Sequence, residues 1–180
     1  MKYLLTTLIS LYIGLVQASV ITDKEAPNFA LMDSFGKTVS LSDFSGKNVV
    51  LEWTNHDCPF VAKHYKTGNM QSTQTYAQEN DAIWLTIISS APGTQGYVLS
   101  AKANELTASR NALPRHVLFD PEGNVGLTYG AKTTPHMYII DAKGTLRYQG
   151  AIDDAGGRGF NLKNLLEADN YVKNALKEIQ

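Results

Sequence analysis

Residues 49–61 are the most informative segment of the chain and read Val49-Val50-Leu51-Glu52-Trp53-Thr54-Asn55-His56-Asp57-Cys58-Pro59-Phe60-Val61. It begins with an apolar run that carries a single charge, which is typical of a strand covered on both faces. Pro59 suits the first position of a helix, because the N–H that proline lacks would have no partner there. Cys58 is then predicted to cap that helix, where the helix dipole favours a thiolate over a thiol. We therefore interpret Cys58 as a functional thiol, although a free cysteine is commonly a small buried hydrophobe.

The N-terminus carries the features of a secretory signal peptide. Lys2 precedes an apolar stretch from Leu4 to Val16, which ends at Val16-Gln17-Ala18, with small residues three and one positions before a cut. The stretch is shorter than the roughly 20 apolar residues that a membrane-spanning helix needs, so we expect no stable membrane anchor. We expect residues 1–18 to be removed on export to the periplasm or the medium, and residues 19–180 to form one domain.

Cys58 is the only cysteine of the 180-residue chain. In an oxidising compartment most cysteines are paired, so a lone one is free, paired between chains or reactive. The net charge of −1, without a basic block, argues against a nucleic-acid partner. We expect no cofactor, because the glycine-rich segment at 156–159 follows the wrong elements for a phosphate loop.

Predicted strands and helices alternate along the rest of the chain. Strands are expected at 49–53, 83–89 and 117–119, hairpins at 29–40 and 137–149, and helices after Cys58 (interrupted at Gly68), around 97–108 and from 164 to 179. A short helical turn is expected at 40–44 and a glycine-rich loop at 153–160. Strand–helix–strand units imply parallel pairing, and the second hairpin adds antiparallel strands at one edge. The expected fold class is α/β, with a mixed central sheet and helices on both faces.

This order of elements, with a cysteine at the first long helix and Thr134-Pro135 before the hairpin, resembles the thioredoxin fold, a three-layer sandwich. From about Phe29 to the last helix, the chain is similar to the redoxin branch of that fold, which includes alkyl hydroperoxide reductase and thiol-specific antioxidant proteins. The sharpest matches are 52–61, Lys63-His64-Tyr65, Lys132-Thr133-Thr134-Pro135-His136 and Gly150-Ala151-Ile152-Asp153-Asp154. The resemblance implies that Pro135 is cis and lies against the active sulfur, with Thr134 beside it.

The chain departs from the patterns of this branch. Thioredoxins carry Cys-x-x-Cys and peroxiredoxins carry Thr-x-x-Cys, and Asn55 stands at the earlier position of both motifs. Peroxiredoxins also place an arginine just before the hairpin strand, where this chain has Pro135. The resemblance therefore implies neither an internal dithiol nor the usual helpers of peroxide cleavage. Arg110 and Arg147 are the candidates to replace that arginine.

The function favoured by these features is an exported, thiol-dependent oxidoreductase of the antioxidant type. Cys58 is the expected nucleophile, and the amide of Asn55 is a candidate donor to developing charge. His56, Lys63 and His64 are candidates to favour the thiolate. Because the chain has no second cysteine, we expect the partner to be an external thiol reductant or a disulfide-bearing protein.

Two alternatives stay open at this point. In the first, the chain binds or delivers copper, with Cys58, His56 and His136 as soft and imidazole ligands. In the second, the chain is a binding module that kept the fold and lost the chemistry, since a fold alone does not guarantee activity.

Overall fold

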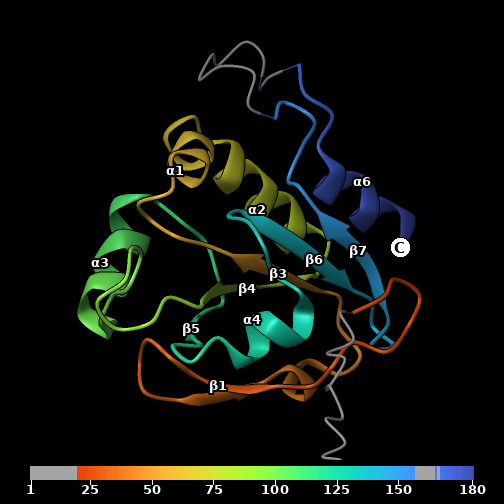
Figure 1. The fold of residues 1–180 in the computed structure, drawn as a ribbon. Coiled ribbons are helices and arrows are strands. Elements are labelled where there is room, and N and C mark those ends of the chain that lie inside the picture. The colour runs from red at the N-terminus through yellow and green to blue at the C-terminus, as the bar shows by residue number, and fades with distance from the viewer. Residues whose placement is uncertain (1–19, 157–164, 166) are drawn as a thin grey trace, which may run out of the picture.

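The computed structural model describes residues 20–156, 165 and 167–180 (Figure 1). The described residues form a seven-stranded sheet in the order β2-β1-β5-β4-β3-β6-β7. The strands are β1 (Ala30–Asp33), β2 (Thr38–Ser40), β3 (Val49–Trp53), β4 (Ile83–Ile88), β5 (His116–Phe119), β6 (His136–Ile140) and β7 (Leu146–Gly150). The helices are α1 (Pro59–Lys66), α2 (Asn69–Glu79), α3 (Ser100–Ser109), α4 (Asn124–Tyr129) and α6 (Tyr171–Glu178), with a 3-10 turn at Leu41–Phe44.

The sheet is mixed, as predicted. Strand β3 pairs in parallel with β4 on one side and antiparallel with β6 on the other. The β6–β7 hairpin closes one edge of the sheet, and the β1–β2 hairpin closes the other edge through an antiparallel pairing of β1 with β5. Every residue of β3 is buried, which confirms that its apolar run is covered on both faces.

Alternation along β3 divides the core into two layers. Val50 packs with apolar residues of α1, α2 and α6, whereas Leu51 and Trp53 pack with Tyr129 of α4. Figure 1 shows the same arrangement, with α1, α2 and α6 on one side of the sheet and α4 on the other. The chain is therefore a three-layer α/β sandwich, and the predicted fold class is confirmed.

The break predicted at Gly68 is real and separates two helices. Gly68 has a φ of 77° and stands between α1 and α2. A residue with a side chain rarely adopts this left-handed conformation, which explains why the helical pattern stops at a glycine. Helices α1 and α2 nevertheless stay in contact along the same face of the sheet.

The structure contains one helix that the sequence pattern did not predict. Helix α4 is short, and the carboxylate of Asp120 accepts the backbone N–H groups of Val125 (3.3 Å) and Gly126 (2.8 Å) near its start. The same carboxylate accepts the Ser89 hydroxyl at 2.6 Å, and Ser89 accepts the indole N–H of Trp53 at 3.0 Å. This chain of hydrogen bonds ties α4 to β3 and to the residue that follows β4.

The last helix is shorter than predicted. We expected it from about residue 164, but residues 167–170 are not helical and α6 begins at Tyr171. The side chain of Asn170 accepts the N–H of Lys173 at 2.9 Å and so caps the helix at this point. Residue 164 and most of the predicted loop at 153–160 lie outside the described residues, as does the predicted signal peptide.

Asp120 offers a direct test of how α4 is held. Asp120→Ala is expected to lower the free energy of unfolding by about 2–3 kcal/mol, because a buried carboxylate that accepts several hydrogen bonds leaves its donors unpaired when it is removed. Urea unfolding followed by tryptophan fluorescence measures this change. Glu122→Ala is the matched control, since Glu122 is exposed in the same turn and accepts only the exposed side chain of Asn124. Equal losses in the two variants would contradict the role given to Asp120.

Candidate functional site

Cys58 caps α1, as predicted. Its backbone is extended (φ −71°, ψ 124°), Pro59 is the first helical residue, and the side chain is partly exposed. The thiol donates a hydrogen bond to the carbonyl oxygen of Thr134, with 3.1 Å between sulfur and oxygen. The sulfur makes no side-chain capping bond to the first amides of α1. The expected contact with these amides is therefore absent from this arrangement, and a carbonyl acceptor holds the thiol proton instead.

The carbonyl of Thr134 reaches Cys58 because of the sheet register. Trp53, the last residue of β3, is opposite His136, the first residue of β6. The segment after β3 and the segment before β6 consequently meet at one end of the sheet. The Thr134–Pro135 peptide bond is cis, which confirms the geometry that the resemblance implied.

Asn55 lies beside the thiol loop, but both ends of its amide have partners. Its Oδ1 accepts the N–H of Asp57 at 2.9 Å, and its Nδ2 lies 3.5 Å from the carbonyl oxygen of Gln95. The side chain packs on Gly96 so closely that a Cβ at Gly96 would fall 2.5 Å from Asn55 Cγ. Asn55 thus shapes the loop before Cys58. Its Nδ2 carries two N–H groups and makes only this one long contact among the described residues, so its role as a donor stays a prediction.

The two histidines of the predicted copper set lie apart from a common centre. His56 Nε2 is 3.3 Å from the carboxylate of Asp57, and His136 Nδ1 is 3.1 Å from the hydroxyl of Tyr138. No group of three or more His, Cys, Asp or Glu side chains in the described part of the chain is arranged to hold a metal ion. Cys58, His56 and His136 are therefore not brought together as the alternative required.

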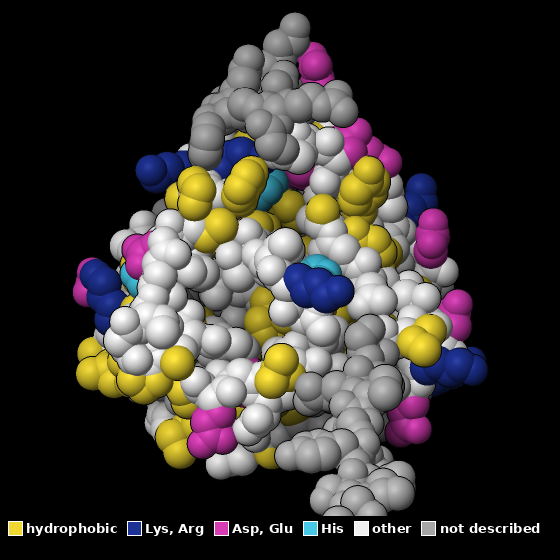
Figure 2. Space-filling view, in the orientation of Figure 1, with side chains coloured by type: hydrophobic (Ala, Val, Ile, Leu, Met, Phe, Trp, Pro, Cys, Tyr) yellow, Lys and Arg dark blue, Asp and Glu magenta, His cyan; other side chains and the backbone are white. Residues whose placement is uncertain are grey.

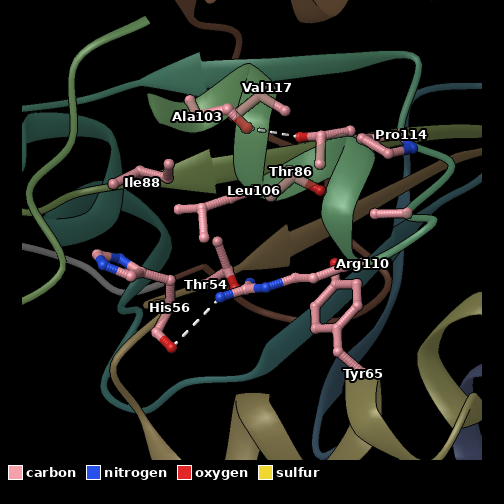
Figure 3. A pocket seen from close by; sticks show the side chains of 12 residues that line it. Thr54, His56, Tyr65, Thr86, Ile88, Ala103, Leu106, Arg110, Pro114 and Val117 are labelled. Carbon is pink, nitrogen blue, oxygen red and sulfur yellow. Dashed lines mark hydrogen bonds between the residues drawn. The ribbon is translucent and has the colours of Figure 1, made fainter. Parts of the chain in front are cut away.

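Of the two candidate arginines, Arg110 is the one near the site. Its guanidinium lies over the ring of Tyr65, 5.1 Å from the centroid, and donates to the carbonyl oxygen of His56 at 3.3 Å (Figure 3). Arg147 pairs instead with Asp23 at 2.8 Å and with Asp141 at 3.5 Å. Asp141 follows β6, at the end of the sheet away from Thr134, so Arg147 has no part in this site.

A buried carboxylate in β3, Glu52, belongs to the surroundings of the site and was missed by the sequence analysis. It is fully buried and accepts hydrogen bonds from the hydroxyl of Tyr65 (3.0 Å), the indole N–H of Trp84 (2.9 Å) and the hydroxyl of Thr86 (3.1 Å). Burial raises the pKa of Glu52, and these donors only partly oppose the shift. The single charge within a buried strand was the sequence signal that pointed to it.

A small, partly open pocket lies between the neighbours of this carboxylate and the loop before Cys58. It has a volume of about 30 Å³ and lies between α1, α3, β4 and β5, with Thr54, Tyr65, Thr86 and Arg110 in its wall (Figure 3). The hydroxyl of Thr54 is buried beside Glu52, and within the described residues it makes no hydrogen bond of regular geometry.

His64 is buried on the other flank of α1 and does not act as a cation. Its Nδ1 lies 3.6 Å from a carboxylate oxygen of Asp153, and Asn69 Nδ2 lies 2.8 Å from each of these two atoms. Burial lowers the pKa of His64 to about 4, Asp153 opposes this shift, and Lys63 adds to it. At neutral pH His64 is uncharged, so it gives no electrostatic support to a thiolate, contrary to our expectation.

Two hollows flank Thr134. One has a volume of about 360 Å³ and includes Trp53, Asn55, Leu127 and Lys132 in its lining. Figure 2 shows a hollow near the centre of the face that carries α4, bordered mainly by uncharged side chains. The other hollow, of about 240 Å³, is lined by Phe60, Lys63, His64, Thr133, Thr134, Pro135, Ala151, Ile152, Asp153 and Gly156. Thr134, whose carbonyl accepts the Cys58 thiol, lines both hollows.

The sheet order, the capping cysteine and the cis proline together define a protein of the thioredoxin-like class. The chain belongs to the AhpC/TSA family, whose family model matches residues 22–149. This match confirms the redoxin resemblance that the sequence motifs indicated.

Individual relatives agree with that class. A thioredoxin peroxidase from Fasciola hepatica is 29% identical over 142 residues, covering 74% of this chain and 72% of the relative. The thiol-disulfide oxidoreductase ResA from Bacillus subtilis (strain 168) is 30% identical over 118 residues, covering 59% of this chain and 66% of ResA. The crystal structure of the exposed lipoprotein thioredoxin Etrx1 from Streptococcus pneumoniae superimposes with a TM-score of 0.56 at 28% identity, covering 84% of this chain and 99% of that structure. At the level of enzyme class, the comparisons confirm the expectation of a thiol oxidoreductase.

None of the helices within the described residues combines the length and the apolar character that crossing a bilayer requires.

The burial of Glu52 predicts a pH-dependent difference between the protein and its Glu52→Gln variant. The raised pKa means that the folded state holds the proton more tightly than the unfolded chain, so folding loses stability as the pH rises above the ordinary value of 4.5. The variant cannot lose this proton, and its stability relative to the wild type should therefore increase with pH. Urea unfolding at several pH values between about 5 and 9 measures the trend.

Glu79→Gln is the control for this prediction, because Glu79 is exposed at the end of α2. Its stability difference from the wild type should stay nearly constant over the same range. A Glu52→Gln difference that is also flat with pH would show that Glu52 titrates normally.

Proposed function

We propose that the mature protein is an exported thiol–disulfide oxidoreductase of the antioxidant type that uses Cys58 as its nucleophile. The observation that carries this proposal is the contact between Cys58 Sγ and the carbonyl of Thr134, immediately before the cis proline. Cys58 is the only residue of the chain that can form a disulfide. Its side chain is partly exposed at the start of α1. A thiol of this kind meets the requirement of access that disulfide exchange imposes.

The single cysteine determines the reaction cycle that we propose. The Cys58 thiolate attacks a substrate disulfide, forms a mixed disulfide with one half and releases the other half as a thiolate. An external thiolate then attacks the mixed disulfide, takes the bound half as a new disulfide and regenerates Cys58. One such cycle exchanges one half of the substrate disulfide for the external thiol. Complete two-electron reduction of the substrate needs a second external thiol, which attacks the new disulfide and releases the remaining half as a thiolate, because the chain holds no resolving cysteine. The partner is accordingly a small thiol or a disulfide-bearing protein.

Reduction of peroxide is a second reaction open to the same sulfur, and the surroundings favour it less. In that reaction the thiolate attacks a peroxide oxygen, becomes a sulfenic acid and releases an alcohol or water; two external thiols then restore it. The Asn55 amide, at the position of the peroxiredoxin threonine, is engaged with Asp57 and Gln95. Arg110 contacts the His56 carbonyl and the Tyr65 ring. We therefore place disulfide exchange ahead of peroxidase activity.

The proposed location outside the cytoplasm rests on residues 1–18, which have the composition of a signal peptide. Etrx1, which shares the fold, is described as an exposed lipoprotein. Processing after Ala18 would leave Ser19 as the first residue of the mature domain. Intact mass of the protein from a secreting host tests this part independently of the thiol chemistry.

Mass spectrometry of Cys58 tests the chemistry. The folded protein is treated with a small neutral disulfide, or with hydrogen peroxide followed by a small thiol, and the adduct on Cys58 is identified. We expect a mixed disulfide that a small thiol removes, formed about tenfold faster than on the same cysteine in the urea-unfolded chain.

The unfolded chain is the matched reference because it contains the same sulfur without the helix or the cis proline. Cys58→Ser should give no adduct. A folded Cys58 that reacts no faster than the unfolded one would favour the alternative of a binding module that has lost the chemistry.

A further inference from the structure

Lys63 is a cation buried beside the proposed site. Its residue is 4% exposed, and its Nζ donates to the carbonyl oxygen of Gly156 at 2.8 Å. An ammonium group has three N–H donors, and within the described residues only this one neutral acceptor is hydrogen-bonded to them, which leaves two donors without a partner there. Among the described residues, no carboxylate oxygen lies within 4.0 Å of Nζ to form an ion pair. A buried charge without a counter-charge is costly unless a ligand supplies one.

The ammonium lies in the wall of the 240 Å³ hollow that also contains Thr134 and Pro135. On the outer side of this hollow stands Phe60, which is 46% exposed and whose ring centroid is 5.9 Å from Lys63 Nζ. The hollow therefore combines one cation with an accessible aromatic face. Thr134, whose carbonyl accepts the hydrogen bond of Cys58 Sγ, lines this hollow and so connects it with the reactive sulfur.

The acidic residue in the same hollow does not satisfy Lys63. Asp153 Oδ2 accepts from Asn69 at 2.8 Å, and Asp153 Oδ1 accepts the N–H of Ala155 at 3.1 Å. Both oxygens are thus held by neutral donors. The neighbouring His64 is uncharged near neutral pH, as described above. The negative charge of Asp153 offsets part of the electric field of Lys63. Asp153 does not accept a hydrogen bond from the two remaining N–H donors of Lys63.

We propose that this hollow binds the carboxylate of a small disulfide or thiol that reacts with Cys58. Lys63 supplies the counter-charge and two N–H donors, and Phe60 covers the apolar atoms between the carboxylate and the sulfur. This inference rests on the proposed function and specifies its substrate class as a carboxylate-bearing small thiol compound. Lys63 then acts as a specificity-determining residue, since its contact lies away from the bond that is exchanged.

The experiment compares a matched series of disulfides on the mature chain. The rate of mixed-disulfide formation on Cys58 is measured with 3,3′-dithiodipropionate, which is anionic, and with 2-hydroxyethyl disulfide, which is neutral. A substitution that changes the reactivity of the Cys58 thiol itself alters both rates equally, so the ratio of the two rates reports only the preference for the carboxylate. We expect Lys63→Gln to lower the anionic-to-neutral ratio about three- to tenfold, the range for loss of one charge-assisted hydrogen bond or ion pair.

Lys66→Gln is the matched control, because Lys66 belongs to the same helix, is exposed and lies on its other flank. It removes the same charge and should leave the ratio near the wild-type value. Lys63→Arg keeps the charge and should retain most of the preference. An unchanged ratio in Lys63→Gln, or an equal fall in both glutamine variants, would overturn the proposal.

A measurement on the wild type covers the case in which Lys63→Gln does not fold. The carboxylate 3-(methylthio)propionate cannot form a disulfide, and it should slow the reaction of Cys58 with 2-hydroxyethyl disulfide, whereas its methyl ester should not. Equal behaviour of acid and ester would reject the carboxylate site. Failure of Cys58 to react with the neutral disulfide at all would instead reject the proposed function, so the two failures are distinguishable.

Discussion

The pairing of β3 with β6 is the constraint on which the site depends. The register that sets Trp53 opposite His136 brings the ends of two distant segments together, one carrying Cys58 and the other Thr134. Because β3 is buried on both faces and lies in the middle of the sheet, this register is strongly specified. A slip of one residue would turn Glu52 and Trp53 to the wrong layers and separate the sulfur from its carbonyl partner.

Local signals account for what the sequence could predict. The apolar run of β3, the proline after Cys58 and the glycine between α1 and α2 act through their own backbone preferences, so each was readable without a partner. The cis bond at Pro135 came from the family resemblance and not from local chemistry. The fold class and the position of the thiol followed from these few features.

The properties that could not be predicted all depend on distant partners. Helix α4 begins where the carboxylate of Asp120 accepts a backbone N–H group of the helix. The side chain of Asn55 is hydrogen-bonded because the loop at Gln95 and Gly96 packs against it. His64 loses its charge because tertiary packing buries it, and the nearby carboxylate of Asp153 opposes this effect only in part. The sequence shows that these side chains exist, but burial and pairing are decided by tertiary contacts.

The contact between Gly96 and Asn55 has a consequence for how this protein could change over time. The loop before α3 and the loop before Cys58 fit together without room for even one methyl group at Gly96, whose φ of 85° also disfavours any other residue. Neither loop can be remodelled alone. The exposed side chains of the two hollows beside Thr134, Phe60 in one and Leu127 in the other, are not restricted in this way, so substrate preference can change there at less cost.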